Sequence, residues 1–436
     1  MEEYWESRVY SLLDLCHCRS VEAIIETPPA VRRGAVGLAM RLLSDPDRVR
    51  PTPAQALAFR RFADVCDPVA DDLVVAMRAH GPGILRRQVE AAIEHGIEAV
   101  QSPAPEVVEF IRALEDEPFW LDRGKLALGA QAMGRVPLDL LVCLTTAITL
   151  PGSYVSPRVN DVLLHSGDLR ERAAGRVAET VGWVVDCTQP GGMDRFGPGF
   201  ATTARVRLIH AFIRAGIGGL DDWDTQTRGR PLNQLHYCVT MIPLLGVALG
   251  THVLGHLQTR AERDGVIHLY RYMAHLMGVS PDLQITDLDD LFRLTWLAAW
   301  SESDPDESSR ELTTAVLDAV PDLFDLSSGG RLRRRVHRNV HHDLVRLTFG
   351  HDYADVTGVD RLSLLGAPVL GAYTIRHLLP QVARRLVPGG NARAAARGHR
   401  ERAVRMAVLK ERLGALPYQR DGAVATVRRR HERLSF

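Results

Sequence analysis

Lysine is nearly absent from this 436-residue chain: of its 53 basic residues, only Lys125 and Lys410 are lysines. We interpret this scarcity first as a mark of GC-rich coding. The basic residues are balanced by 53 acidic ones, so the formal net charge is zero. That balance removes any whole-chain argument for a nucleic-acid or anionic-membrane partner, and we expect no nucleic acid to bind.

Cysteine and long apolar runs are also scarce. The six cysteines are scattered without the spacing of a disulfide framework, so we expect reduced thiols. The longest apolar runs, Leu140–Leu150 and Val239–Leu254, fall short of the ~20 residues that a transmembrane helix needs and are interpreted as buried core helices. Glu2, Glu3 and Glu6 stand where a secretory signal needs basic residues, which predicts a cytoplasmic protein.

Helical periodicity dominates the sequence and predicts an all-α fold. Apolar residues recur at three- and four-residue spacing, prolines and glycines separate the segments, and no stretch alternates with period two for long enough to build a sheet. We expect a helical N-terminal region (1–100), a central domain with the densest apolar helices (101–380) and a basic helical tail (381–436).

The basic tail carries 14 Arg or Lys residues against 4 acidic ones and includes the run Arg428–Arg430. A solvated face that packs on an acidic body is the favoured interpretation. A contact with nucleic acid or anionic lipid is the alternative.

The segment from Ala201 to Arg214 carries the most informative pattern. On a helix, Thr203, Arg207, His210 and Arg214 share a stripe about 60° wide between two apolar faces. The stripe holds no carboxylate, and a buried cation costs several kcal/mol unless an anion meets it. The alternative is that the stripe is the solvent face of an ordinary amphipathic helix.

The charges on this stripe predict a neutral histidine. Arg207 and Arg214 lie one turn on either side of His210 and disfavour its imidazolium form, which leaves a lone pair available for a metal. Guanidinium groups also bind carboxylates in a bidentate manner, and haem propionates are carboxylates. A neutral histidine between two such cations is what the proximal side of a haem requires.

Arg207-Leu-Ile-His210-Ala-Phe-Ile-Arg214 resembles the signature of the latex-clearing-protein type of rubber oxygenase, a family that includes the oxygenase of mycophenolic acid biosynthesis. Further motifs lie in the order this family has, and the resemblance covers roughly residues 105–350. They are Arg176-Val-Ala-Glu179-Thr180, Arg230-Pro-Leu-Asn233-Gln234, Gly250-Thr251-His252 and Tyr270-Arg271-Tyr-Met-Ala-His275-Leu-Met-Gly278-Val279.

The resemblance implies a globin-like helical core with additional N- and C-terminal helices. It implies that His210 is the axial ligand of a noncovalently held haem b, and that Arg207 and Arg214 steady the cofactor together with Thr203, which shares their stripe. Arg176 and Thr180, at i and i+4, would line the haem pocket. The family's activity is oxidative cleavage of isoprenoid double bonds with dioxygen.

This chain departs from the family pattern at two places. Rubber-cleaving members place a lysine, able to cap the iron, where this chain has Glu179. Their upstream catalytic glutamate falls in the region Val159-Asn160-Asp161-Val162, so Glu179 or Asp161 is the candidate acid or base. Because no secretion signal is found, a small diffusible isoprenoid or polyketide-like substrate is expected rather than polymeric rubber.

Two other functions stay open at this point. A haem-binding protein without catalysis, such as a sensor or carrier, would keep the pocket and lose the distal groups. A helical scaffold would use the basic tail to dock on an anionic partner. A homo-oligomer is possible in each case.

Other motifs are weaker. Cys16-His17-Cys18 and the pair His337 and His341 could bind metal, but the first lacks a second ligand pair and the second lies in a basic segment that we expect to be solvated. His252 and His275 are expected to be satisfied core histidines, although either could lie distal to the iron. Asn233 and Thr251 are expected to form hydrogen bonds at helix ends.

Overall fold

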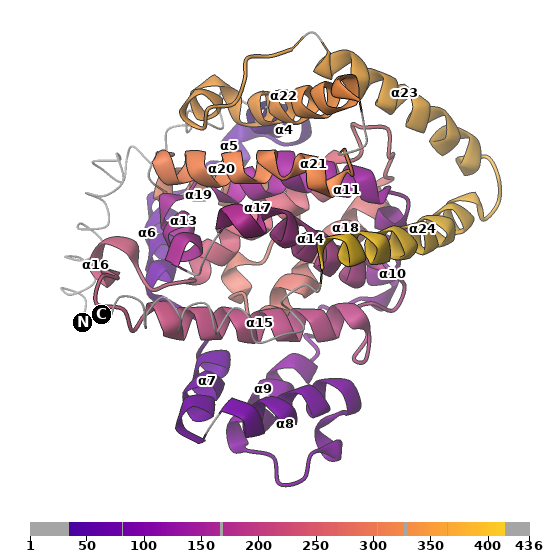
Figure 1. The fold of residues 1–436 in the computed structure, drawn as a ribbon. Coiled ribbons are helices and arrows are strands. Elements are labelled where there is room, and N and C mark those ends of the chain that lie inside the picture. Colours follow the sequence, from indigo (N-terminus) through magenta and orange to yellow (C-terminus); the bar gives the residue numbers. More distant parts are fainter. Residues whose placement is uncertain are drawn as a thin grey trace.

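The computed structural model describes residues 35–414, except residues 81, 166–168, 303, 327–329 and 364. Every regular element in this part of the chain is helical (Figure 1), which confirms the predicted all-α class. The Cys16-His17-Cys18 motif and the Arg428–Arg430 run lie outside the described residues.

The first half of the described chain contains α4 to α14. Their bounds are α4 Ala35–Leu43, α5 Pro46–Val49, α6 Pro53–Arg61, η1 Phe62–Asp64, α7 Pro68–His80, α8 Pro82–His95, η2 Ile97–Ala99, α9 Pro105–Glu115, α10 Arg123–Gly134, α11 Leu138–Leu144, the π-helix η3 Thr145–Thr149, α12 Leu150–Ser153, α13 Pro157–His165 and α14 Leu169–Thr188.

The second half contains α15 to α24. Their bounds are α15 Pro198–Ile217, α16 Thr225–Arg228, α17 Gln234–Gly250, α18 Arg260–Leu276, η4 Pro281–Leu283, α19 Leu288–Ser301, α20 Glu307–Asp318, α21 Val320–Leu323, α22 Arg331–Val356, α23 Gly366–Arg385 and α24 Gly390–Leu413.

One large hydrophobic core joins most of these helices. It runs from Ala56 to Leu409 and takes buried residues from α7 and α9 as well as from α24. The core therefore crosses residues 100 and 380, where the sequence suggested boundaries, and the three-region division stays a prediction. In Figure 1 α7, α8 and α9 lie below α15, whereas α22 and α23 lie at the opposite end.

Helices α10 and α18 approach each other closely because both carry a glycine at the crossing. A Cβ atom on Gly129 would lie 2.4 Å from the carbonyl oxygen of Gly265, and one on Gly265 would lie 2.9 Å from the amide nitrogen of Gly129. The absence of side chains at both positions lets the two backbones touch.

Helices α14 and α15 form the antiparallel pair on which the candidate site is built. At one end of the pair the indole Nε1 of Trp183 donates to the hydroxyl of Thr203 over 2.8 Å, and that hydroxyl donates to the carbonyl of Gly199. A Cβ on Gly199 would meet the backbone of Cys187 at 2.5 Å, so the two helices are in close contact there.

The predicted helix-end roles of Asn233 and Thr251 are confirmed. Asn233 is the N-cap of α17, and its side-chain oxygen accepts a hydrogen bond from the amide of His236. The Thr251 hydroxyl donates to the carbonyl of Ala248 at the other end of the same helix.

Among the described residues, no single helix is long and apolar enough to cross a membrane. The segments Arg123–Gly134 and Leu138–Ser153 reach that length and composition only when they are counted together, across a bend of 93°.

The glycine crossing yields a stability prediction. We expect Gly129→Ala to lower the free energy of unfolding by about 2–3 kcal/mol, because the added methyl group must push two backbones apart. The matched control is Gly371→Ala in α23, where nothing lies within 4 Å of the added Cβ. That variant should gain up to about 1 kcal/mol from helix propensity. Urea denaturation measures both, and equal effects of the two substitutions would contradict the crossing.

Candidate functional site

The middle of α15 is held by a buried ion pair between Arg207 and Asp67. The guanidinium Nε and one terminal nitrogen donate to the two carboxylate oxygens of Asp67 over 2.7 and 2.8 Å. The side chains are only 6 % and 3 % exposed. This bidentate geometry is the strong form of an arginine–carboxylate contact, and it ties α15 to the residue that immediately precedes α7.

Two other residues shape the space around this ion pair. Gly278, with φ of +79°, packs against it so closely that a Cβ would lie 2.6 Å from the Asp67 carboxylate and 2.8 Å from the Arg207 Nε. The Phe110 ring lies beneath the guanidinium carbon at 5.6 Å. Gly278 is therefore required twice, once for its backbone conformation and once for its lack of a side chain.

Arg214 makes a second contact of the same kind, one helical turn beyond His210. Its guanidinium binds the carboxylate of Asp71 in the first turn of α7 at 2.7 Å, and donates to the carbonyl of Leu232. The prediction that these buried cations need anions is confirmed, since Arg207 and Arg214 are each 5 % exposed. The anions are aspartates of the chain itself, so neither arginine needs a haem propionate for charge balance.

His210 lies between these two ion pairs. Its Nδ1 atom is buried and has no hydrogen-bond partner, and its ring packs at 5.5 Å on that of Tyr237 from α17. Burial lowers the pKa of His210 to about 3, with further lowering from Arg214 and Arg176 and an opposing effect of Asp67. The predicted neutral imidazole is confirmed, but Arg176 rather than Arg207 is the second cation that favours it.

Helix α14 carries Arg176, Glu179 and Thr180, and Arg176 lies near His210. Arg176 is close enough to lower the pKa of His210 and also that of Tyr154, a buried phenol after α12. Burial raises the pKa of Glu179, and Arg176 partly opposes this. The Thr180 hydroxyl donates to the carbonyl of Arg176 over 3.0 Å, so its oxygen can still accept a hydrogen bond.

Two predicted site residues are used elsewhere. Asp161 pairs with Arg228 at 3.1 Å on the outer side of α13, and this contact leaves Glu179 as the stronger acid–base candidate. Thr203 is fully buried, and its hydroxyl is committed to Trp183 and Gly199 in the α14–α15 contact. Thr203 therefore supports the helix pair, and a direct contact with a cofactor is not available to its hydroxyl.

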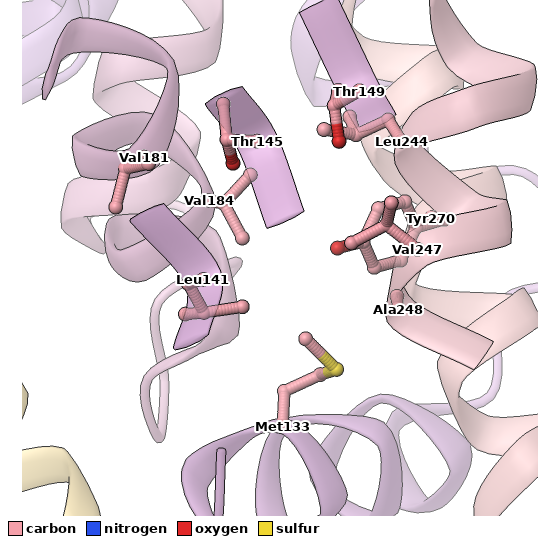
Figure 2. A pocket seen from close by; sticks show the side chains of 10 residues that line it. All are labelled: Met133, Leu141, Thr145, Thr149, Val181, Val184, Leu244, Val247, Ala248 and Tyr270. Atoms are coloured by element: carbon pink, nitrogen blue, oxygen red, sulfur yellow. The ribbon is translucent and has the colours of Figure 1, made fainter. Parts of the chain in front are cut away.

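A small cavity lies within the bundle, where Val181 and Val184 of α14 form part of its wall. Figure 2 shows the hydroxyls of Thr145, Thr149 and Tyr270 directed toward it from otherwise apolar walls. The Thr149 hydroxyl is buried without a partner, and both threonines belong to the π-helix, a feature frequent at functional sites. The cavity has a volume of about 10 Å³, which suits roughly one water molecule and is far too small for a porphyrin.

The other histidines have partners or positions of their own. His252 accepts from the amide of Gln258, and His275 contacts the carbonyl of Asp116. The predicted solvated face is wrong for His341, which is 1 % exposed because it packs against Phe324. In the described residues, no group of three or more His, Cys, Asp or Glu side chains is arranged to hold a metal ion.

The residues around His210 fit one axial haem ligand, which requires a neutral imidazole with an uncommitted nitrogen. They do not provide Arg207 and Arg214 as propionate anchors, because both are bound to aspartates. Arg176 forms no ion pair within the described part of the chain and is the guanidinium left near His210 for an acidic group.

Sequence reasoning missed Asp67, Asp71, Tyr154 and Tyr237. The dipeptide Asp67-Pro68 does predict a helix start, and the Asp67 side chain accepts from the amide of Ala70 as a cap does. Nothing local, however, indicates that the same carboxylate meets an arginine 140 residues later. The two tyrosines carry no motif at all.

The comparisons with known proteins decide the family. A family model described as "ER-bound oxygenase mpaB/B'/Rubber oxygenase, catalytic domain" matches residues 131–434. The chain belongs to this family. It is therefore an oxygenase, and the match runs through the basic tail that was predicted to stand apart from the catalytic domain.

A solved structure has the same fold. The chain superposes on a structure titled "Structure of Latex Clearing Protein LCP in the closed state" with a TM-score of 0.58 and 19 % sequence identity, covering 78 % of this chain and 91 % of that one. At this identity the likeness concerns the fold. A search of curated proteins finds no match.

The lowered pKa of His210 yields a pH prediction. Between its ordinary pKa of 6.5 and about 3, His210 binds a proton in the unfolded chain but not in the folded one, so stability falls as the pH falls through this window. We expect the wild type to lose up to about 1.4 kcal/mol per pH unit more than His210→Gln between pH 6 and 4. Urea unfolding of cofactor-free protein measures this. His95→Gln, at an exposed position, is the control, and parallel curves for His210→Gln and wild type would contradict the assignment.

Proposed function

We propose that this oxygenase depends on haem b and uses dioxygen to attack the double bond of a small, unsaturated, hydrophobic substrate. The observation that carries the proposal is the buried and unpartnered Nδ1 of a neutral His210 at the centre of α15. An imidazole in this state can serve as an axial iron ligand, and the family's oxygenase activity supplies the reaction class.

The residues of the chain divide the work. His210 would hold the cofactor, which supplies dioxygen binding and electron transfer when bound. The ion pairs of Arg207 with Asp67 and of Arg214 with Asp71 keep α15 in register, so that the imidazole faces α14 and α17. These four side chains act as positioning residues.

The polar residues of α14 would handle protons and developing charge. Burial raises the pKa of Glu179, although Arg176 partly opposes this, so its carboxyl group keeps a proton to a higher pH than an exposed glutamate does. It would therefore serve as proton donor and acceptor. Arg176 provides a positive charge beside His210. The Thr180 oxygen can accept a hydrogen bond from the substrate.

The absorption spectrum of the purified full-length protein tests the cofactor. We expect a Soret band in the wild type and its loss, by at least about tenfold per mole of protein, in His210→Ala. His236→Ala is the matched control, since His236 likewise has a buried, unpartnered Nδ1 and a pKa lowered to about 3. Equal haem content in the two variants would contradict axial ligation by His210.

Dioxygen uptake separates the oxygenase from a haem-binding sensor or carrier. With isoprenoid olefins as probes, an oxygenase consumes dioxygen in proportion to olefin loss, whereas a carrier only binds it. Glu179→Gln should keep the haem and lower the turnover rate about 10²-fold, in the range of a lost general acid–base group. Uptake that is unchanged in Glu179→Gln would remove Glu179 from the mechanism.

A further inference from the structure

Helix α23 presents apolar side chains outward. Ile375, Leu379, Val382 and Leu386 are 63 %, 68 %, 46 % and 81 % exposed. Their spacing of four, three and four residues places them on one stripe of the helix and its C-cap. Figure 1 shows α23 at the rim of the molecule, between the end of α22 and the start of α24.

The inward face of α23 carries polar side chains whose contacts fix the orientation of the helix. The Tyr373 hydroxyl lies 3.0 Å from Nε2 of His256, and the Gln381 amide lies 3.3 Å from Nδ1 of the same histidine. His256 is 3 % exposed. Rotating α23 to bury its apolar stripe would break both contacts, so the stripe stays outward.

The segment that carries this stripe has charge of one sign. Residues 361–400 contain no aspartate or glutamate and seven arginines. Arg376 and Arg385 lie on α23 itself, and both are exposed. An exposed apolar stripe with cationic neighbours is the pattern of a helix that lies in a membrane interface and is attracted to anionic headgroups.

We propose that α23 docks this protein on the surface of an anionic lipid membrane, with Ile375, Leu379, Val382 and Leu386 entering the interface. A second copy of the chain fits the same stripe less well. A two-fold contact through α23 would bring the basic segment 361–400 against its own copy, and like charges would oppose the association. A lipid surface satisfies the apolar stripe and the arginines together.

This proposal does not depend on the haem. No single helix in the described residues is long and apolar enough to span a membrane. Docking through α23 would bring the enzyme to a hydrophobic substrate that partitions into lipid. The tests of haem content and dioxygen uptake can therefore contradict the proposed function while the vesicle test supports docking. The opposite combination of results can also occur.

Sedimentation of the full-length protein with vesicles tests the docking. We expect binding to vesicles of three parts phosphatidylcholine and one part phosphatidylglycerol, and binding about tenfold weaker or more to pure phosphatidylcholine or at high salt. The variant Ile375→Asp with Leu379→Asp should lose at least about tenfold in vesicle affinity, while its thermal unfolding stays that of the wild type because both side chains are exposed.

The matched control replaces two exposed apolar residues on α7 and α8. Val75→Asp with Ile84→Asp adds the same charge at 64 % and 55 % exposed positions, far from α23 in Figure 1, and should bind vesicles like the wild type. Equal vesicle binding by both double variants would overturn the proposal. A wild type that ignores vesicles but forms a dimer, which Ile375→Asp with Leu379→Asp dissociates, would overturn it in favour of a second copy.

Discussion

The ion pair between Arg207 and Asp67 joins the middle of α15 to the start of α7, where water has almost no access. Removing one partner of such a pair leaves a buried charge and typically costs 3–5 kcal/mol. Gly278 closes over the pair, and Phe110 lies beneath the guanidinium. Segments from four parts of the chain therefore meet at one contact, and that contact sets the rotation of α15.

The rotation of α15 decides what His210 can do. With Arg207 and Arg214 turned toward α7, the imidazole between them faces Tyr237 and the Arg176 level of α14. Burial and the nearby guanidinium groups keep the ring neutral. Arg214 thus favours the neutral form of the imidazole, while its own ion pair is with Asp71.

Much of this could be predicted from local patterns, because they reflect short-range physics. The all-α class follows from apolar periodicity and the Asn233 cap from one side chain and one turn. The neutral His210 follows only in part from Arg214 on the same helix, because burial and Arg176 of α14 also lower its pKa. The partners of Arg207 and Arg214 could not be predicted. The position of an arginine on a buried helix face shows that it needs an anion, but not which residue supplies that anion. The same limit applies to Thr203, whose stripe position says nothing of Trp183 on the neighbouring helix.

The structure also shows the surroundings of the residues at which this chain departs from the family pattern. Glu179, which stands where rubber-cleaving relatives are expected to carry a lysine, is a desolvated acid beside Arg176. Asn160, in the region of the expected upstream glutamate, is fully buried and holds the carbonyl of Tyr154, while Asp161 turns outward to Arg228. The acid–base candidate has thus moved to the helix that faces His210. The outward stripe of α23 lies apart from these residues, at the rim of the fold.

The double variant Arg207→Met with Asp67→Leu tests the central ion pair most directly. If the two side chains satisfy each other, each single substitution strands a buried charge, and the double variant is more stable to urea than either single one and keeps the Soret absorbance of the wild type. If Arg207 instead binds a haem propionate, the stability losses of the two single substitutions add in the double variant. In that case Arg207→Met loses the haem, while Asp67→Leu keeps it.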